Sequence, residues 1–193
     1  MPGGSKSAWL ALALAALLLR AWGLGWGEPP IRAHPDELHY AGLAGKLSWS
    51  DLNPRYYENP PLLTYVLFGA RELRALAAGE EANREWVRTG GLFRLSRWIG
   101  VLSGVATVLL VGAACRRLTG RDAAGFAAGA VVACSFLHGR DSHYGVNDVP
   151  MTALLALSLL WAVRACQGEG LRWARLSAVA AGLAAATKYP GAF

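Results

Sequence analysis

Apolar stretches separated by short polar connections recur along this chain. Five of them are candidates for membrane-spanning helices: Ala8–Trp26, Trp98–Cys115, Ala123–Leu137, Val149–Ala165 and Leu176–Pro190. A straight helix needs about 20 residues to cross a bilayer, and several of these stretches are shorter. They are rich in Ala and Gly, which suits close helix packing, and Gly125 and Gly129 form a small-xxx-small pair. The pattern predicts an all-α fold, a polytopic transmembrane helical bundle.

A sixth stretch, Pro60–Ala78, is ambiguous because charged residues follow its apolar beginning. It suits either a span or a helix lying in the membrane interface. If it lies in the interface, Arg140 is the only arginine of the later loops that faces outward. Six arginines of these loops then face the cytoplasm: Arg116, Arg117, Arg121, Arg164, Arg172 and Arg175. If it spans the bilayer, the count reverses. The positive-inside rule therefore favours the interface.

This choice predicts the organisation of the whole chain. A first span at 8–26 is followed by one long extracytoplasmic loop, 27–97, which carries interfacial helices, and further spans lie within 98–193. The first span is interpreted as an uncleaved signal anchor, since no small-x-small cleavage site follows it. Because the sequence stops in or just past an apolar stretch, we expect it to be the N-terminal part of a longer protein.

Composition agrees with a membrane protein. Hydrophobic residues make up 54% of the chain and charged residues 17%, which is unlike an ordinary soluble domain. The net charge of +6 lies mostly in loops between apolar stretches, where topology explains it and no nucleic-acid partner is implied. The three cysteines have no metal-type spacing and are interpreted as small hydrophobic residues.

Two adjacent carboxylates, Asp36 and Glu37, follow the first span. Pro35 suits the first position of a helix, and the helix dipole favours acids in the first turn, so the pair also has a purely structural interpretation. Adjacent side chains on a helix diverge by about 100°, whereas Asp36 and Tyr40 lie one turn apart on one face. We therefore expect Asp36 to face a site and Glu37 to face a structural partner.

Two further acids each lie just before the start of an apolar stretch. Glu58 precedes Pro60 and Pro61, which favour an extended backbone before the next helix, and Asp148 precedes Pro150 at the start of a span. Each has a structural alternative as a helix cap, and this alternative is stronger for Asp148. In the predicted topology both acids lie on the same side of the membrane as the acid pair.

The histidines give a weaker signal. All four lie on the outer side in this topology: His34, His39, His138 and His143. The first two are five residues apart, which is not the i, i+4 spacing of a helical zinc site. No metal ligand is assigned, and a divalent metal ion is left open as a cofactor.

Cations on the same side matter if the substrate carries phosphate. Arg55 and Lys188 are candidates, the first as a bidentate partner and the second as a point charge. For Arg140, contact with lipid head groups is the stronger interpretation.

Five short motifs follow one another along the chain: PDELHYA at 35–41, YENPPL at 57–62, RLTGR at 117–121, YGVND at 144–148 and TKY at 187–189. In this order they resemble the N-terminal part of the GT-C superfamily of membrane glycosyltransferases, and most closely the branch with protein O-mannosyltransferases and the lipid A aminoarabinose transferase. The resemblance covers nearly all of residues 8–193. It rests on the order of the motifs, because none is highly specific alone. Some relatives carry a Lys directly after the acid of the second motif, where this chain has Asn59.

The resemblance implies an integral, multi-pass protein of the plasma (inner) membrane with an extracytoplasmic active site. It implies transfer of a sugar from a polyprenyl-phosphate donor to a protein, lipid or glycan acceptor by inverting direct displacement. Asp36 would be the catalytic base, and Glu37 would orient it or the acceptor. The substrate-binding positions would be Tyr40, Arg55, Glu58, His143, Asp148 and Lys188.

Two rival hypotheses are a non-catalytic, transporter-like membrane protein and an inactive scaffold subunit. Acids inside the bilayer mark ion or proton paths, but here the acids stand at the ends of apolar stretches. Arg20 is the only charge well inside a confident span. These positions count against a transporter, and the retained acids count against an inactive scaffold.

Overall fold

The computed structural model describes residues 3–28 and 34–192, and the regular elements within them are all helical. The all-α prediction is confirmed. In chain order the helices are α1 (Gly3–Ala21), α2 (Pro35–Lys46), α3 (Leu62–Ala78), α4 (Glu80–Arg88), α5 (Gly91–Thr119), α6 (Asp122–Cys134), α7 (Phe136–Asp141), α8 (Asp148–Cys166) and α9 (Leu171–Thr187), followed by the 3-10 turn η1 (Tyr189–Ala192). Residues 29–33 of the predicted long loop, and Phe193, lie outside the described residues.

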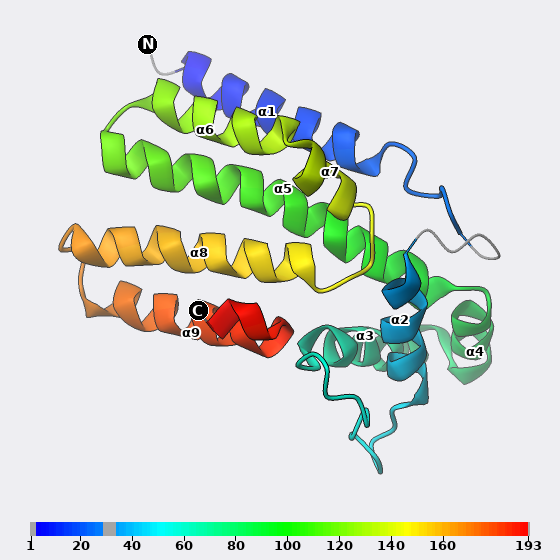
Figure 1. Cartoon of the computed structure of the whole chain (residues 1–193). Coiled ribbons are helices and arrows are strands. Elements are labelled where there is room, and N and C mark those ends of the chain that lie inside the picture. Colours follow the sequence, from blue (N-terminus) through cyan, green and yellow to red (C-terminus); the bar gives the residue numbers. More distant parts are fainter. Residues whose placement is uncertain (1–2, 29–33, 193) are drawn as a thin grey trace.

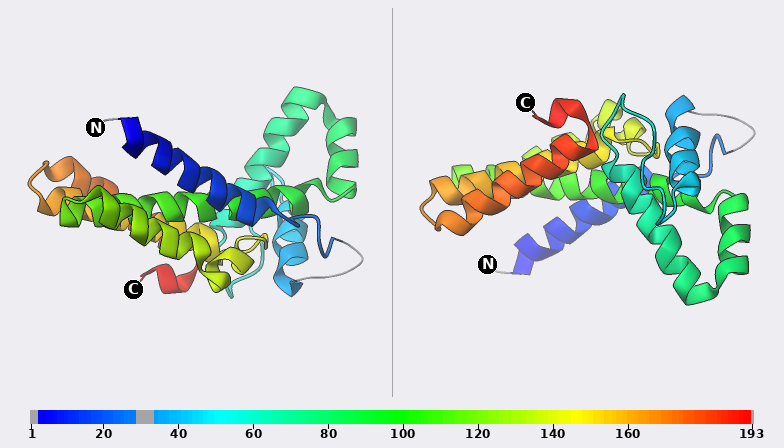
Figure 2. Two further views of the ribbon diagram at one scale, coloured as in Figure 1. Left: turned by 90° about the horizontal axis from the view of Figure 1, so that it is seen from above. Right: turned by 90° about the horizontal axis from the view of Figure 1, so that it is seen from below.

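Five helices form an elongated bundle around α5. In the view of Figure 1 they lie in the order α1, α6, α5, α8 and α9 from top to bottom. Helix α5 packs against α1, α6 and α8, and α8 packs against α9. Helices α2, α3 and α4 gather at one end of the bundle, and Figure 2 shows α3 and α4 projecting sideways from it.

The glycines predicted to lie at helix contacts do so. A Cβ atom added to Gly112 of α5 would lie 2.8 Å from the carbonyl oxygen of Gly125, and one on Gly125 would lie 2.7 Å from that of Gly112. One on Gly129 would lie 2.9 Å from the side chain of Leu12 in α1. The backbones of α5 and α6 approach this closely because no side chain stands between them.

Two of the five predicted spans meet a length-and-composition criterion for crossing a membrane within the described residues. These are the helices α5 and α8, and α6 is a shorter apolar helix. Helix α6 ends at Cys134, three residues before the predicted boundary, because the backbone of Ser135 is extended (φ −64°, ψ 116°) and the short helix α7 follows. Large apolar side chains such as Leu18 (69% exposed) and Val131 (71% exposed) cover the outer surface of the bundle. Such surfaces suit lipid or further protein better than water.

The predicted loop 27–97 is largely helical. Helix α2 begins at Pro35 as expected, and the ambiguous apolar stretch forms α3. Helix α5 begins at Gly91, seven residues before the predicted start of its span, because Gly90 takes a left-handed conformation (φ 84°) and caps it. The last residues of the predicted loop are therefore the first turns of the central helix.

A hydrophobic core joins this end of the molecule to the bundle. Its buried members come from α2, α3, α5 and the connection before α8: Tyr40, Ala44, Leu63, Leu67, Leu92 and Val146. The guanidinium of Arg71 in α3 also donates to the carbonyl oxygens of Ala44, Gly45 and Leu47, at 2.7–3.0 Å, and so satisfies the end of α2. Helix α2 is thus fixed both to α3 and to the bundle.

The two basic connections lie together at the opposite end of the bundle. Arg117, at the end of α5, contacts Glu169, and Arg164, at the end of α8, pairs with the same carboxylate at 2.7 Å. The predicted acid sites and the predicted basic loops therefore occupy opposite ends of the described structure (Figure 1).

Candidate active site

A buried ion pair holds Glu37. The Nε and Nη2 atoms of Arg97 donate to the two carboxylate oxygens of Glu37 at 2.7 and 2.9 Å, and the two side chains are only 2% and 1% exposed. Arg97 Nη1 also donates to the carbonyl oxygens of Leu24 and Trp26 at 2.6 and 2.7 Å, and the Gly145 N–H donates to Glu37 at 2.9 Å. These bonds tie α2, α5, the chain after α1 and the connection before α8 together.

Asp36, the neighbouring acid, is exposed. Its backbone N–H donates to Nδ1 of His34, which caps α2, at 3.2 Å. Among the described residues its carboxylate makes no hydrogen bond or ion pair, whereas the carboxylates of Glu37, Glu58 and Asp148 each have a partner. Asp36 is therefore the acid of this set whose oxygens are available to a substrate.

Tyr40 belongs to the first acid motif and packs against Val146 of the YGVND motif. It is buried, at 3% exposed. Burial has the largest effect in raising the pKa of its hydroxyl, followed by the influence of Tyr56, Asp36 and Asp148. Tyr40 also shares a hydrophobic core with Val146, two residues before α8, so its ring links the first turns of α2 to the chain that leads into α8. Its hydroxyl stays protonated and remains able to donate a hydrogen bond.

Asp148 and Lys188 form an ion pair. The ammonium nitrogen of Lys188 lies 2.6 Å from Oδ1 of Asp148, and the two side chains are 29% and 47% exposed. Asp148 is the first residue of α8 and Lys188 follows the last residue of α9. Two of the predicted substrate-binding residues, 40 positions apart, are thus in direct contact.

Glu58 and Asn59 belong to a small hydrogen-bonded group around Tyr40. The Tyr56 hydroxyl donates to Glu58 Oε2 at 3.3 Å. The Asn59 Nδ2 group donates to the hydroxyls of Tyr40 and Tyr56 at 3.3 and 3.2 Å. Asn59, which stands where some relatives have a Lys, therefore links the second motif to the first through hydrogen bonds.

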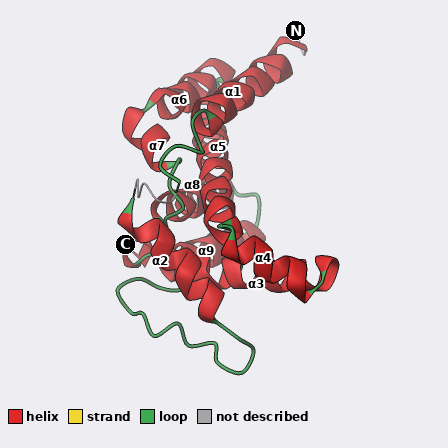
Figure 3. Cartoon of the chain, turned by 90° about the vertical axis from the view of Figure 1, so that its right-hand side faces the viewer, coloured by secondary structure: helices red, strands yellow, loops and turns green. Residues whose placement is uncertain are grey.

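Arg55 lies on the exposed loop between α2 and α3, which Figure 3 shows as a long stretch of irregular chain. Its guanidinium pairs with Asp51 on the same loop at 2.9 Å, and its side chain is 76% exposed. The structure does not bring it into contact with Lys188. The loop itself does reach that segment, because the hydroxyl of Tyr189 donates to the carbonyl oxygen of Tyr57 at 3.0 Å.

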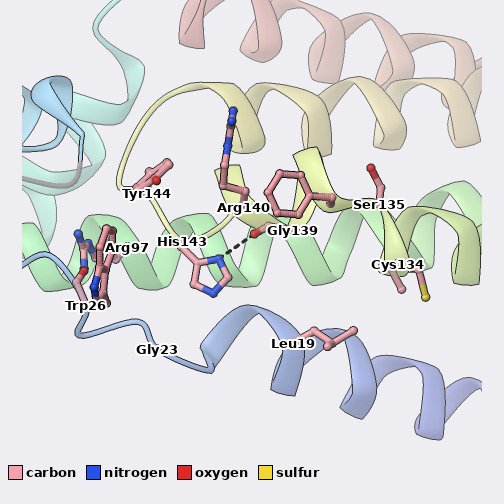
Figure 4. A pocket seen from close by; sticks show the side chains of 12 residues that line it. Leu19, Gly23, Trp26, Arg97, Cys134, Ser135, Gly139, Arg140, His143 and Tyr144 are labelled. Carbon is pink, nitrogen blue, oxygen red and sulfur yellow. Dashed lines mark hydrogen bonds between the residues drawn. The ribbon is translucent and has the colours of Figure 1, made fainter.

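His143 lines a cavity of about 590 Å³ between α1 and α7. Its Nδ1 lies 2.8 Å from the carbonyl oxygen of Gly139 and its Nε2 lies 2.9 Å from that of Trp22, so both ring nitrogens have backbone partners. Figure 4 shows Trp26, Arg97 and Tyr144 at one end of this cavity, with Leu19 and Cys134 at the other. Its wall is mostly apolar, and cationic side chains line it at intervals.

A second buried polar group lies beside this cavity. Arg20 is fully buried, and its guanidinium donates to the carbonyl oxygens of Ala16 and Val132 at 3.2 Å and contacts His138 Nδ1 at 3.0 Å. Because Arg20 donates this hydrogen bond, the Nδ1 atom of His138 must be unprotonated to accept it. Burial, and then the charge of Arg20, lower the pKa of His138. The charged residue inside the first predicted span is thus held by the end of α6 and by α7.

Acidification is expected to destabilise the protein through His138. Its pKa in the folded state lies below the ordinary value of about 6.5, so the unfolded chain takes up a proton first as the pH falls. The stability that neutral His138 provides is therefore present above about pH 6.5 and is lost as the pH falls through that value toward the folded-state pKa. A His138→Asn variant, whose amide oxygen can accept the Arg20 bond without titrating, should lose less stability between pH 7.5 and 5.5. Thermal unfolding in detergent at both pH values measures the difference.

The exposed His39 provides the matched control for this prediction. His39→Asn should keep the pH dependence of the wild type. An equal loss of stability on acidification in the wild type and in His138→Asn would contradict the assignment.

The question of a metal site was left open by the sequence. Within residues 3–28 and 34–192, no three His, Cys, Asp or Glu side chains lie close enough to hold a metal ion together. The carboxylates at the acid end of the bundle are arranged instead around tyrosines and cations.

The sequence-based prediction missed Arg97 and the hydrogen-bonding role of Asn59. Arg97 was counted with the loop, although it stands directly before Trp98 in an apolar stretch. A charge at such a position needs a partner, and this requirement is the signal that predicts a buried ion pair. Nothing in the sequence pattern distinguishes Asn59 from an ordinary turn residue.

The comparison with protein families bears on the second half of the chain. A family model described as dolichyl-phosphate-mannose-protein mannosyltransferase matches residues 90–193, which is more than half of the 193 residues. The chain belongs to this family. It is thus a membrane glycosyltransferase chain of the mannosyltransferase type, which uses a lipid-linked sugar.

The matched region begins at the residue that caps α5 and contains three of the predicted site residues, namely His143, Asp148 and Lys188. Asp36, Glu37 and the second motif precede it. No curated protein and no solved structure matches the chain.

Proposed function

We propose that this protein transfers a sugar from a polyprenyl-phosphate donor to a protein, lipid or glycan acceptor outside the cytoplasm, with Asp36 as the catalytic base. The observation that carries the proposal is the convergence of separate motifs at one end of the bundle. Asp36 lies one turn before Tyr40 in α2, and Tyr40 packs with Val146 just before α8. Asn59 bonds to the Tyr40 hydroxyl, and Lys188 pairs with Asp148. In a chain of this glycosyltransferase family, such a group is the best candidate for the reacting centre.

The reaction we propose is a single displacement with inversion at the anomeric carbon. The acceptor hydroxyl oxygen forms a bond to that carbon while the bond from the carbon to the donor's phosphate oxygen breaks. Asp36 takes the proton of the hydroxyl, and the polyprenyl phosphate leaves with the bonding electron pair. Lys188 stabilises the negative charge on the departing phosphate, which needs a cation more than a proton donor.

The other side chains have positioning roles in this proposal. Glu37, held by Arg97, fixes the first turn of α2 and with it the direction of Asp36. Tyr40 offers a hydroxyl to the sugar or the acceptor from a buried ring. Glu58 and Asp148 line the sugar, or position a cation. Arg55 and His143 are retained only as contacts with outlying parts of the substrate.

Two cavities with apolar walls support a lipid-linked donor. One is the cavity between α1 and α7. The other, of about 570 Å³, lies among α3, α5, α8 and α9 and reaches Pro150 and Thr187, which adjoin the Asp148–Lys188 pair in the sequence. A lipid whose chain lies in such a cavity would bring its phosphate to the polar end of the bundle.

The topology completes the proposal. We place the acid end, with residues 27–97, outside the inner membrane and the basic connections in the cytoplasm, in a multi-pass protein. A cysteine introduced at position 50, on the α2–α3 loop, or at position 140 in α7, both of which are exposed, should then react with a membrane-impermeant reagent from outside only.

The direct test is sugar transfer by the full-length protein reconstituted in liposomes. Labelled polyprenyl-phosphate sugars are supplied as donors, with protein, lipid and glycan acceptors in separate reactions. We expect the label to move to one acceptor class with release of polyprenyl phosphate and inversion of the anomeric configuration. A reconstituted protein that releases no polyprenyl phosphate with any donor would contradict the proposal.

A further inference from the structure

A cleft rich in tyrosine lies beside the acid end of the bundle. It has a volume of about 420 Å³ and is formed by the α2–α3 loop, the start of α3 and the segment after α9. Four of the six tyrosines in the chain line it: Tyr56, Tyr57, Tyr65 and Tyr189. The amides of Asn53 and Asn59 and several prolines complete the wall. Its volume falls within the range of about 300–1,000 Å³ that is usual for small-molecule sites.

Hydrogen bonds hold this tyrosine cleft in shape. The Tyr65 hydroxyl donates to the carbonyl oxygen of Leu52 at 3.1 Å, and the Tyr57 hydroxyl donates to Asn53 Oδ1 at 3.2 Å. The bond from Tyr189 to the Tyr57 carbonyl closes the other side. The three bonds link the walls of the cleft from α3 to the segment after α9.

The loop that forms the cleft also contains a strained residue. Arg55 has a φ of 53°, and among the described residues it is the only one other than glycine with a positive φ. A bulky side chain in this conformation is unfavourable and persists only where the surrounding structure enforces it. The turn at Arg55 directs the chain into the Tyr56–Tyr57 segment of the cleft wall.

The chemistry of the cleft fits a pyranose ring. Tyr57 and Tyr189 are 71% and 54% exposed, so their ring faces are open to a ligand. Aromatic faces pack against the C–H face of a sugar, while hydroxyl and amide groups bond to its hydroxyls. An anion is less suited, because no Lys or Arg is among the described residues that line the cleft. The polar groups of the wall also disfavour a hydrocarbon chain.

The cleft is connected to the acid site. Asn59 lines the cleft and donates to Tyr40, and the ring of His39 lies 4.3 Å from that of Tyr56 in an edge arrangement. A ring bound in the cleft would therefore lie next to the first turns of α2, where Asp36 is exposed.

We propose that the tyrosine cleft binds a pyranose ring, either the sugar of the donor or the terminal sugar of a glycan acceptor. The inference rests on the proposed function for its biological meaning, but binding can be measured without turnover. It assigns sugar recognition to Tyr57 and Tyr189, which stand in two of the sequence motifs but were not among the predicted substrate-binding positions.

Saturation-transfer NMR on the full-length protein in detergent, with methyl α-D-mannopyranoside as the probe, tests the proposal. We expect transfer to the ring protons of the glycoside, and about tenfold weaker binding in Tyr57→Ala and in Tyr189→Ala, which remove an aromatic face. Tyr57→Phe keeps the ring but loses the bond to Asn53, and it should bind more tightly than Tyr57→Ala. Trp22→Ala removes a side chain that is 85% exposed outside the cleft and is the matched control.

The source of the sugar follows from the kinetic parameters of the same variants. A raised KM for the polyprenyl-phosphate sugar alone identifies the donor ring, and a raised KM for a glycan acceptor alone identifies the acceptor ring. Wild-type affinity for the glycoside in both alanine variants would overturn the inference. Binding of an extended proline-containing peptide in place of the glycoside would also overturn it, since such peptides use aromatic grooves as well.

The two proposals fail in different ways. If the protein binds the glycoside through Tyr57 and Tyr189 but transfers no sugar, the proposed function is contradicted and the proposed binding site is supported. If the protein transfers sugar normally and the alanine variants neither lose binding nor change either KM, sugar binding in the tyrosine cleft is contradicted and the proposed function is supported.

Discussion

Replacing Asp36 with Asn is expected to lower the rate of sugar transfer by about 10²–10⁴-fold, the usual contribution of a general base. The amide has nearly the same size as the carboxylate but cannot take the acceptor proton. The exposed side chain has no hydrogen-bond or ion-pair partner among the described residues, so the protein should fold and insert normally. Initial rates in liposomes, with a saturating donor and acceptor, measure the effect.

Asp122→Asn is the matched control for this experiment. Asp122, like Asp36, is an acid in the first turn of a helix, but it begins α6 at the opposite end of the bundle. If Asp36 merely stabilises the start of α2, the two variants should behave alike. Near-normal sugar transfer by the Asp36→Asn variant would show that Asp36 is not the catalytic base.

Replacing Arg97 with Met should destabilise the folded protein by about 3–5 kcal/mol, the usual cost of removing one partner of a buried ion pair. The change leaves the carboxylate of Glu37, which is 1% exposed, with the Gly145 N–H as its remaining donor. It also leaves two carbonyl oxygens of the chain after α1 without their donor. Thermal or denaturant unfolding in detergent measures the loss.

Arg94→Met tests whether burial is the cause. Arg94 lies on the same helix one turn earlier and faces Glu28 at 3.6 Å, but its side chain is 47% exposed. An exposed pair of this kind contributes about 0–1 kcal/mol, so this variant should be nearly neutral.

The double variant Glu37→Leu with Arg97→Leu should be less destabilised than the Arg97 single variants, because no unpaired charge remains in the interior. A strictly additive loss in the double variant would show that the two charges do not interact. Transfer activity should fall in each of these variants, since the first turn of α2 loses its anchor.

The helices at the acid end were predictable to different degrees. The start of α2 at Pro35 follows from local chemistry, because proline is preorganised for the first helical position and His34 caps the turn. The boundaries of α5 and α6 depend on single backbone conformations at Gly90 and Ser135. An apolar pattern does not encode these conformations, so the predicted ends were displaced by several residues.

The candidate site was predicted as a set of residues but not as a geometry. The sequence order of Asp36, Glu58, Asp148 and Lys188 indicated one chemistry, through resemblance to a family whose model matches the second half of the chain. Neighbouring positions on a helix face different directions, which was enough to separate Asp36 from Glu37. It was not enough to name Arg97, which lies 60 residues from Glu37 in the chain.

By itself, the sequence determined the helical class, the apolar character of the bundle and the positions of the acids at the ends of its apolar stretches. These properties depend on residue type and on local spacing, which a linear pattern contains. Only the tertiary structure decided which acid is buried and which is exposed, and that Tyr40 packs against the chain that leads into α8. It also decided that Tyr189 shares one cleft with three tyrosines more than 100 residues earlier in the chain. Such relations arise when α2, α3, α8 and the segment after α9 pack at one end of the bundle, and no local preference of the chain specifies them.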